Sequence, residues 1–559
     1  MSCRIAWHEW RWVSLVSALI VCLSVLPYLI VWLLTPPDLV YSGFLTNPLD
    51  GHTYLAKMRQ GADGDWLFRL PFTSEPQRGV FFFAYYLALG HLSAWLGLPL
   101  ITVYHVARCA GGFLLLLVGY RFIAEFLPEL RGRRVAFLIL AFSSGLGWLM
   151  AMLGVMGLDL WVAEANTFYS IFVNAHFALA QALIMLIFLA VAAPLDQAMG
   201  LMNPRGVGFH NCPSPGAGIE PYPALRLALS MGASLALAIV MPLALAPVFT
   251  VLALFLFWRT LSRRVENRAG FVGSWTRAIT AGLACCPFLV YYFAVVLRDP
   301  AMTAWSAQNV TPTPAFRQLL AGYGFLVPLA LLGVGWGLRR GRTVFLLTWV
   351  SVTAAFVYAP IALQRRMLIG FHAPIAILAA LGFICVIGPL VRRRESLMTL
   401  IAFLLLTPTT LVLLSMPVIG AMKGEWPLFM TGAESEALQW LREQSPRDSV
   451  VLASPQVGLM VPALAGNRVI YGHPFETIDA ARKQAEVERF FAGQIDPNEL
   501  LSRYDIHYVF VGPKERALGG FDAARLSSKW SLDTVYTNDG VTIYRVAAGR
   551  RLASSPAAH

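Results

Sequence analysis

The sequence predicts an α-helical polytopic membrane protein with about eleven transmembrane helices and a C-terminal α/β domain outside the bilayer. Three observations predict this fold class. The chain is 57% hydrophobic and only 13% charged. Apolar runs of about 20 residues, long enough to cross a bilayer, recur along it. The arginines between these runs fall into short clusters. This composition excludes an ordinary soluble protein.

The net charge of +12 raises the question of nucleic acid binding, but the placement of the cations indicates another role. Short basic loops stay on the cytoplasmic side during membrane insertion. We therefore interpret the arginine clusters as topology signals and expect no nucleic acid partner. The clusters are Arg131, Arg133 and Arg134; Arg259, Arg263, Arg264 and Arg268; Arg339, Arg340 and Arg342; and Arg392, Arg393 and Arg394.

The topology follows from placing every arginine cluster inside. With Arg4 and Arg11 in the cytoplasm, residues 12–34 cross outward and residues 35–98 form a first external loop. Residues 80–98 are apolar, yet a span there would put the next arginine cluster outside, so we expect a helix in the outer interface. The other spans are expected at 99–127, 134–156, 171–193, 224–241, 243–260, 276–297, 318–338, 343–362, 372–391 and 397–416. We therefore expect residues 1–420 to form the membrane domain of a multi-pass protein of the cell (inner or plasma) membrane, with the N-terminus inside.

The composition changes at about Thr431. AESEALQWLREQ has helical periodicity, whereas DSVVLAS, NRVIYG, HYVFVG and TNDGVTIYRV are short β-branched runs with turn residues beside them. Residues 431–546 are therefore expected to form an extracytoplasmic α/β domain, and residues 547–559 a disordered tail. Residues 194–223, rich in Pro and Gly, are expected to form an irregular cytoplasmic connection.

The stretch NPLDGHTYLAKMRQGADGDW, residues 47–66, gathers charged side chains directly after the first span. We expect a helix that Asn47 caps, that begins at Pro48 and that ends at Gly61. Asp50, Tyr54 and Lys57 then share one face of it. Asp50 has two interpretations: a partner of the helix dipole, worth about 0.3–1 kcal/mol, or a group that takes part in chemistry. The spacing does not decide between them.

Two further groups of polar residues lie where spans are expected to reach the outer face. Gln364, Arg365 and Arg366 follow one span and His372 opens the next. External arginines run against the inside bias, so they indicate an anion such as a lipid phosphate, or arginines that reach lipid headgroups. Glu164 lies at the outer interface, and His176 enters an apolar run, where it is either satisfied by a neighbour or part of a site.

The motifs of the first external loop carry a resemblance to a known family. Asp50 is followed by Tyr54, then by Gly64-Asp65-Trp66, and by Glu75 before the aromatic run 81–86. This pattern resembles the GT-C superfamily of polytopic membrane glycosyltransferases, in particular its aminoarabinose transferase and protein mannosyltransferase branch. The resemblance covers the first third of the chain and the general pattern of spans beyond it.

The resemblance implies an inverting transferase that moves a sugar from a polyprenyl-phosphate donor to a glycan, lipid or protein acceptor on the outer face. It implies that Asp50 is the catalytic carboxylate, acting either as general base or as the ligand of a divalent cation, Mn²⁺ or Mg²⁺. Family members often carry a second acid where this chain has Gly51, and Glu164 is the candidate to supply it. A lysine expected after Glu75 is absent, and Arg78 is its candidate replacement. The remaining candidates for substrate binding are Tyr54, Lys57, His176, Gln364, Arg365, Arg366 and His372.

Two other functions are compatible with the sequence. One is a transporter or flippase for a lipid-linked saccharide, and the other is a catalytically silent scaffold with the same architecture. A transporter is expected to show inverted repeats or charged residues near the middle of its spans. This chain instead concentrates its polar residues at the outer ends of spans, which favours the transferase.

Overall fold

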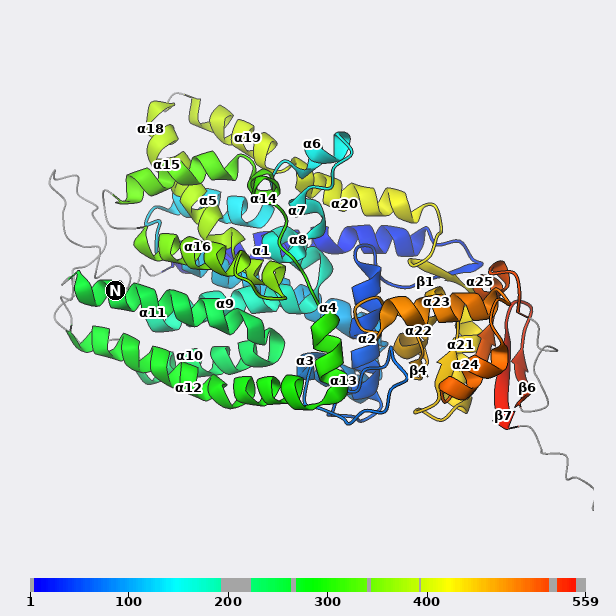
Figure 1. The fold of residues 1–559 in the computed structure, drawn as a ribbon. Helices are drawn as coiled ribbons and strands as arrows, with labels where there is room; N and C mark the ends of the chain where they lie inside the picture. Colours follow the sequence, from blue (N-terminus) through cyan, green and yellow to red (C-terminus); the bar gives the residue numbers. More distant parts are fainter. Residues whose placement is uncertain are drawn as a thin grey trace, which may run out of the picture. The chain divides into compact units, whose positions relative to one another are not determined.

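The computed structural model (Figure 1) describes residues 5–192, 223–262, 268–338, 343–391, 394–521 and 530–548. The chain divides into two compact units, each described here by itself. Unit 1 consists of Met1–Pro27, His105–Tyr292 and Val310–Pro417, and unit 2 consists of Tyr28–Tyr104, Phe293–Asn309 and Val418–His559. The residues expected to form the first external loop therefore belong to the same unit as the C-terminal domain.

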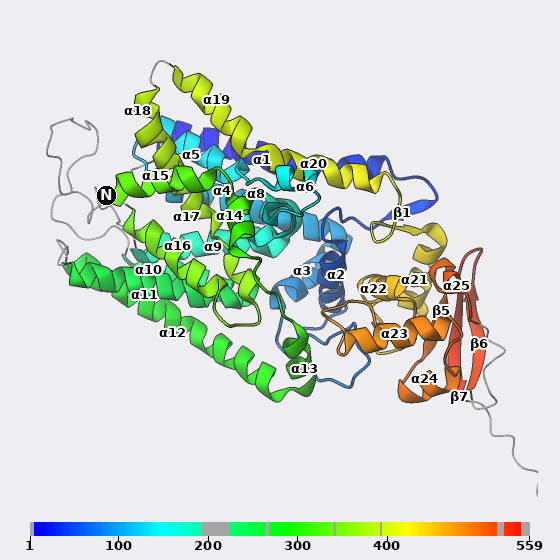
Figure 2. The same ribbon diagram turned by 45° about the horizontal axis from the view of Figure 1, so that its top comes forward.

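Unit 1 is a bundle of helices that run mostly along one axis, as Figures 1 and 2 show. Four of its helices, α1 (Trp7–Leu33), α4 (Leu100–Ile123), α12 (Arg268–Arg298) and α20 (Pro408–Ala421), continue into unit 2. The others are α5 (Leu130–Phe142), α6 (Gly147–Met152), α7 (Leu158–Trp161), η1 (Ala163–Ala165), α8 (Thr167–Val173), α9 (Ala175–Ala192), α10 (Pro223–Val240), η2 (Pro242–Ala244), α11 (Leu245–Leu261), α14 (Phe316–Tyr323), α15 (Leu326–Leu338), α16 (Val344–Val357), η3 (Gln364–Leu368), α17 (His372–Gly382), η4 (Phe383–Ile387), α18 (Gly388–Leu390) and α19 (Glu395–Leu406).

The helices confirm a polytopic membrane protein. Within the described residues, eight helices are long and apolar enough to cross a membrane, and ten if each of two bent pairs forms one span. The bent pairs are Phe316–Tyr323 with Leu326–Leu338, at 83°, and Ser396–Leu406 with Pro408–Ala421, at 44°. Every run expected to span contains a helix, although the run 134–156 is interrupted at residues 143–146 between α5 and α6. The eleventh, α16, is shorter, at 14 residues. The expected irregular connection, residues 194–223, falls on a part of the chain that the structure does not describe, except for Pro223, which begins α10. Several arginines of the clusters also lie outside the described residues: Arg263, Arg264, Arg339, Arg340, Arg342, Arg392 and Arg393.

The beginnings of α1 and α5 are neighbours within unit 1. Arg133 Nη1 lies 2.9 Å from Glu9 Oε1, and the Arg134 guanidinium lies 4.7 Å from the centre of the Trp12 ring. Just beyond the other end of α5, Ser143 Oγ lies 3.1 Å from His372 Nε2 at the beginning of α17. The first basic segment and the first arginine cluster therefore share one end of the bundle, and His372 lies toward the opposite end.

Unit 2 combines the segment after α1 with the α/β domain. Its elements are β1 (Leu39–Tyr41), α2 (Pro48–Ala62), α3 (Ala84–Leu96), α13 (Pro300–Gln308), β2 (Phe429–Thr431), α21 (Gly432–Gln444), β3 (Val450–Leu452), α22 (Pro455–Leu464), β4 (Arg468–Val469), α23 (Ala480–Phe491), α24 (Pro497–Arg503), β5 (Tyr508–Val511), α25 (Pro513–Ala517), β6 (Trp530–Thr537) and β7 (Thr542–Ala548). Strands β1 and β2 pair antiparallel. The five-stranded sheet has the order β4-β3-β5-β7-β6.

The four strands and the helix expected in the C-terminal domain are confirmed as β3, β4, β5, β7 and α21. Strand β3 pairs parallel with β4 and β5, whereas β7 pairs antiparallel with β5 and β6. The parallel strands are buried, as expected for apolar runs between helices. Thr431 begins α21 with a capping box that Glu434 completes. In the expected tail, Ala547 and Ala548 belong to β7, and residues 549–559 lie outside the described chain.

Helices α2 and α3 cross with their backbones in contact. A Cβ at Gly90 would lie 1.9 Å from Met58 O, and one at Gly61 would lie 2.0 Å from Leu87 O. Only glycine fits at such a crossing. The expectation that Gly61 ends its helix is therefore wrong: α2 continues through it to Ala62. The expected interfacial segment is helical over Ala84–Leu96.

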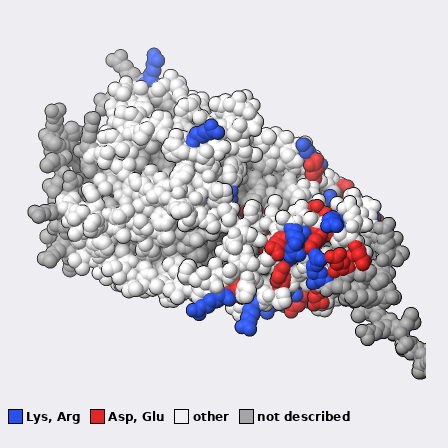
Figure 3. All heavy atoms as spheres, in the orientation of Figure 1, with Lys and Arg blue, Asp and Glu red and all other residues white. Residues whose placement is uncertain are grey.

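Charged side chains are distributed unevenly. On the face that Figure 3 shows, the helices of unit 1 carry few of them, whereas Lys, Arg, Asp and Glu gather over α23 and α24 of unit 2. These side chains pair with one another: Arg482 contacts Asp479 and Glu486, and Arg503 contacts Glu486 and Glu499. The surface over α23 and α24 is thus of mixed sign.

Candidate functional site

Asp50 lies in the first turn of α2, where the helix dipole favours a negative charge. Asn47, directly before the helix, has a left-handed backbone with φ of 50° and makes no side-chain cap hydrogen bond. Its amide Nδ2 instead donates to Asp50 Oδ2 over 2.6 Å. The expected cap by the Asn47 side chain is therefore wrong, since this amide holds the carboxylate of Asp50.

The second neighbour of Asp50 is His473, which follows β4 in the α/β domain. His473 Nε2 lies 3.6 Å from Asp50 Oδ1, and the imidazole is buried whereas the Asp50 side chain is 27% exposed. His473 Nδ1 accepts the backbone N–H groups of Phe475, over 3.1 Å, and of Glu476, over 3.2 Å. A nitrogen that accepts carries no proton, so the proton of this ring is on Nε2 and faces Asp50.

Two turns further along α2, Lys57 pairs with Glu476 from the same loop. Lys57 Nζ lies 2.8 Å from Glu476 Oε1, with side chains only 2% and 11% exposed. It also lies 4.4 Å from the centre of the Phe83 ring. Tyr54 stacks on Tyr86 with 4.6 Å between the ring centres. Both candidates for substrate binding on α2, Tyr54 and Lys57, are thus buried and contact protein groups, and their contact with a substrate stays a prediction. We call Asp50, Lys57, His473 and Glu476 the α2 site.

Burial determines the electrostatics around the α2 site. It lowers the pKa of His52 to about 4, and the nearby His473 lowers it further, although a hydrogen bond to the backbone of Pro48 acts in the opposite direction. It also raises the pKa of Tyr86 well above its ordinary value, and the charge of Asp50 contributes to that shift. His52 and Tyr86 are therefore neutral at physiological pH, and the carboxylate of Asp50 has neutral neighbours.

The structure supplies a lysine beside Glu75 that the local sequence lacks. Lys483 of α23 forms an ion pair with Glu75, and Lys483 Nζ donates to Thr73 Oγ1 over 2.9 Å. Because Lys483 is fully buried, it cannot touch a lipid, and burial lowers its pKa. Arg78, the expected replacement, is exposed. The motif residue Trp66 stacks on His91 with 4.0 Å between the ring centres.

In unit 1, η3 carries two arginines with different surroundings. Arg366 Nη1 lies 2.7 Å from Glu164 Oε1, and the Glu164 side chain is only 4% exposed. The guanidinium carbon of Arg365 lies 4.8 Å from the centre of the Trp161 ring. The structure thus brings three of the predicted residues together, and we call Trp161, Glu164, Arg365 and Arg366 the arginine site.

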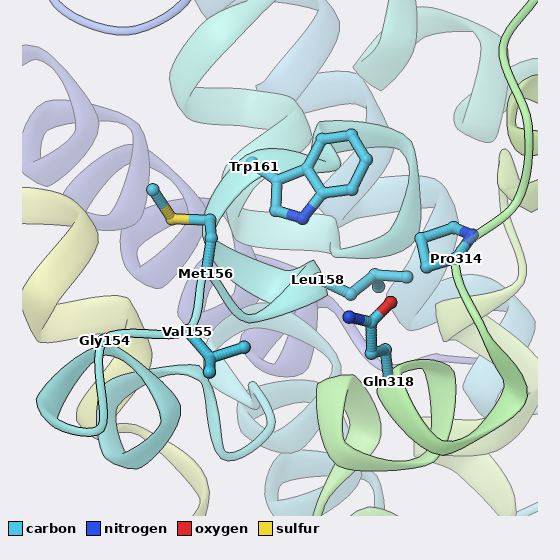
Figure 4. Close-up of a pocket in the computed structure, with 7 residues that line it drawn as sticks. All are labelled: Gly154, Val155, Met156, Leu158, Trp161, Pro314 and Gln318. Carbon is cyan, nitrogen blue, oxygen red and sulfur yellow. The ribbon is translucent and has the colours of Figure 1, made fainter.

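Trp161 also lines a pocket of about 460 Å³ in unit 1. Figure 4 shows its ring together with Leu158, Pro314 and Gln318 around this space. The lining is mostly apolar, and its other members are Gly154, Val155 and Met156. Asp159, which the sequence analysis missed, holds the neighbouring loop: its Oδ2 accepts the backbone N–H groups of Gly145, over 2.8 Å, and of Gly147, over 3.2 Å. No local pattern distinguishes Asp159 from an exposed acid.

The other candidates in unit 1 have partners within the protein. Gln364 Nε2 donates to Ala359 O over 2.7 Å, and its Oε1 accepts the backbone N–H of Thr313. His372 is buried, with Ser143 and Thr167 hydroxyls beside its two ring nitrogens. His176 packs on Phe177 with 4.2 Å between the ring centres. Substrate contacts by Gln364, His372 and His176 stay predictions.

The α2 site was also tested as a place for a divalent cation. Among the residues that the structure describes, no three His, Cys, Asp or Glu side chains come together as metal ligands. Asp50 Oδ2 accepts from Asn47, and the tautomer of His473 directs an N–H toward Oδ1. This arrangement fits an acceptor of protons better than a metal ligand, and metal binding by Asp50 stays a prediction.

Comparison with known proteins identifies similar folds. No family model matches the chain, and no curated protein matches it in sequence. The mycobacterial arabinofuranosyltransferase AftD matches with a TM-score of 0.52 and 14% identity, over 96% of this chain and 40% of that one. The Archaeoglobus fulgidus oligosaccharyltransferase, in complex with Zn and sulfate, matches with a TM-score of 0.51 and 14% identity, over 95% of this chain and 72% of that one. ArnT from Cupriavidus metallidurans, bound to undecaprenyl phosphate, has a TM-score of 0.48 and 12% identity, over 97% and 98% of the two chains.

Proposed function

From the GT-C fold that the chain shares with these glycosyltransferases, we propose that the protein transfers a sugar from a polyprenyl-phosphate donor to a hydroxyl group on the outer face of a cell membrane. The observation that carries this proposal is the state of Asp50. It is a partly exposed carboxylate at a helix N-terminus, held by Asn47 and facing the Nε2–H of His473. The Asn47 amide fixes the orientation of this carboxylate, and an oriented carboxylate within reach of solvent is the group that a general base requires.

In the proposed reaction Asp50 is the general base. The acceptor hydroxyl attacks the anomeric carbon from the face opposite the phosphate, and its proton passes to Asp50 as the new carbon–oxygen bond forms. The bond from the anomeric carbon to the phosphate oxygen breaks with its electron pair, which leaves polyprenyl phosphate as an anion. Attack from the opposite face inverts the anomeric centre, and the leaving phosphate needs no proton.

The arginine site is proposed to bind the donor. Guanidinium groups match phosphate oxygens in geometry and charge. Arg365 is the candidate for this contact, because Trp161 beneath it lines the apolar pocket, and a polyprenyl phosphate joins an anionic head to an apolar chain. Arg366 already pairs with Glu164. A role of Glu164 as the second acid beside this pair stays a prediction.

The orientation is proposed from unit 1. If the N-terminus is cytoplasmic, then Arg133 beside Glu9 is cytoplasmic too. The far end of α5, where Ser143 meets His372, then lies at the outer face. An odd number of spans, eleven, also places the C-terminal domain on that side of the membrane. This agrees with a donor that presents its sugar outside the cell.

The test of this function is Asp50→Asn in the purified full-length protein. The donors are a panel of undecaprenyl-phosphate sugars, the acceptors are host membrane glycans, and released undecaprenyl phosphate is measured. We expect turnover to fall by about 10²–10⁴, with donor affinity and thermal unfolding unchanged. Asp505→Asn, at a side chain 91% exposed in the same unit, is the matched control. Near-normal transfer by a folded Asp50→Asn variant would remove Asp50 from the chemistry, and a loss of donor affinity that depends on added Mn²⁺ or Mg²⁺ would make it a metal ligand.

A further inference from the structure

The loop after β4 lies at the carboxyl end of a parallel strand, on the side of the sheet where open α/β sheets bind ligands. Strands β3, β4 and β5 are parallel, and open α/β sheets bind their ligands outside the carboxyl ends of such strands. In this chain the residues after β4 include His473 and Glu476, both buried. They meet helix α2 there: Glu476 contacts Lys57, and His473 faces Asp50.

The loop is rigidly held, which directs the imidazole. Thr477 Oγ1 accepts the backbone N–H groups of Gly472, over 3.3 Å, and of His473, over 3.2 Å. The backbone N–H of Thr477 donates to His473 O over 3.0 Å. With Nδ1 occupied by Phe475 and Glu476, the ring has one direction in which it can donate, and Asp50 lies there.

The distance from His473 Nε2 to Asp50 Oδ1, 3.6 Å, is slightly longer than a hydrogen bond. Catalytic hydrogen bonds are often this long before substrate binds, and they tighten in the reacting complex. The neighbouring ion pair of Lys57 with Glu476 holds the loop against α2. The loop therefore keeps the Nε2–H of His473 directed at Oδ1 of Asp50.

We propose that His473 is a positioning residue for the transfer reaction, and that the C-terminal α/β domain thereby completes the site on α2. The Nε2–H of His473 holds Oδ1 of Asp50, so that the other face of the carboxylate is oriented toward the acceptor hydroxyl. His473 itself touches no substrate. This inference rests on the proposed function, in which Asp50 accepts the proton.

The chain allows a matched pair of variants. In His473→Asn, the amide oxygen can replace Nδ1 as acceptor for the loop N–H groups, but nothing replaces the Nε2–H. In His473→Gln, the longer side chain brings an amide N–H close to the position of Nε2. We expect kcat to fall by about 10² for His473→Asn, as for a misplaced catalytic group, with KM for the undecaprenyl-phosphate sugar unchanged. We expect His473→Gln to retain kcat within a few fold, and the exposed His8→Asn to behave as wild type.

A second measurement does not depend on turnover. In full-length protein with ¹⁵N-labelled histidine, the Nε2 resonance of His473, assigned by its loss in His473→Gln, should be that of a protonated nitrogen and should shift in Asp50→Asn. Equal losses of kcat in the Asn and Gln variants, a change of KM alone, or a resonance that Asp50→Asn leaves unmoved would overturn the proposal. If the wild type transfers no sugar from any donor, the proposed function fails instead, and the resonance alone decides whether His473 donates to Asp50.

Discussion

Arg365 and Arg366 are neighbours in sequence with different surroundings. Replacing Arg366 with alanine should therefore lower mainly the stability of the protein, and replacing Arg365 should lower mainly its affinity for the donor. Arg366→Ala leaves Glu164, 4% exposed, as a buried charge without its partner. Such a change costs about 3–5 kcal/mol of stability. Arg365→Ala removes the cation over Trp161, at 4.8 Å, a contact worth about 0.5–1 kcal/mol at a partly exposed site.

Affinity for undecaprenyl phosphate should fall more in Arg365→Ala than in Arg366→Ala. If Arg365 contacts the donor phosphate, its loss removes a hydrogen bond to a charged group, worth about 1.5–3 kcal/mol. At about 1.4 kcal/mol for each tenfold change, undecaprenyl phosphate should bind about 10- to 150-fold more weakly. Arg365→Lys keeps the charge but loses the planar fork, so it should recover only part of this affinity. Arg366→Met combined with Glu164→Leu should recover most of the stability that Arg366→Ala loses.

The assay measures thermal unfolding of the detergent-solubilised full chain, and titrates the same samples with undecaprenyl phosphate while tryptophan fluorescence is recorded. A tryptophan beside Arg365 makes the fluorescence sensitive to binding at this place, and Trp161→Phe checks the origin of the signal. Unchanged affinity in Arg365→Ala would refute the assignment and leave this arginine as a contact of lipid headgroups. Loss of affinity in Arg366→Ala without loss of stability would show that the wrong arginine was assigned.

Two further predictions concern α2. Lys57→Met should lower the stability of the full chain by about 3–5 kcal/mol, because Glu476 then remains as a buried charge without its partner. Adding Glu476→Leu should recover most of this stability. Equal unfolding midpoints for the single and the double variant would contradict the prediction. For His52 the pKa is about 4 in the folded chain against an ordinary 6.5. The unfolded chain therefore takes up a proton that the folded chain does not, and about 3 kcal/mol of stability is lost as the pH falls from 6.5 to 4. In His52→Asn the unfolding midpoint should therefore decrease less as the pH falls from 6.5 to 4. An unchanged decrease would show that the pKa of His52 is not lowered.

The spans and strands were predictable because their signals are local. Each apolar run long enough to cross a bilayer identifies itself, and the short β-branched runs of the C-terminal domain became β3, β4, β5 and β7. Helix α22 was not predicted. It begins at Pro455 and contains Pro462, which obscures a helical pattern.

The partners of α2 could not be predicted in this way. Lys57 and Glu476 are 419 residues apart, and Lys483 is 408 residues from Glu75. Nothing in the sequence around His473 distinguishes it from a buried structural histidine. Gly61 was a local signal of the contact between α2 and α3, because no larger residue fits where the two backbones meet. The sequence analysis interpreted this glycine as the end of a helix.

The two arginines of η3 show both the use and the limit of charge patterns. The inside bias indicated that Arg365 and Arg366 need an anion, and the structure provides one for Arg366 in the form of Glu164. A protein carboxylate and a lipid phosphate satisfy the same pattern. Only the geometry separates the two arginines, since Arg365 lies over a ring that lines a pocket.

The buried pairs explain why a catalytic role is assigned to Asp50 and not to its charged neighbours. Lys57 is neutralised by Glu476, and Lys483 by Glu75, in contacts that exclude water from the lysines. Such pairs contribute little net stability but fix geometry, because one misplaced partner leaves a buried charge. The pair of Lys57 with Glu476 holds α2 and the loop after β4 in one arrangement, as a reacting group requires. Asp50 lies on the same helix as Lys57 and is 27% exposed, with the amide of Asn47 and the imidazole of His473 as its neighbours, which is why the proposed function gives the proton to this carboxylate.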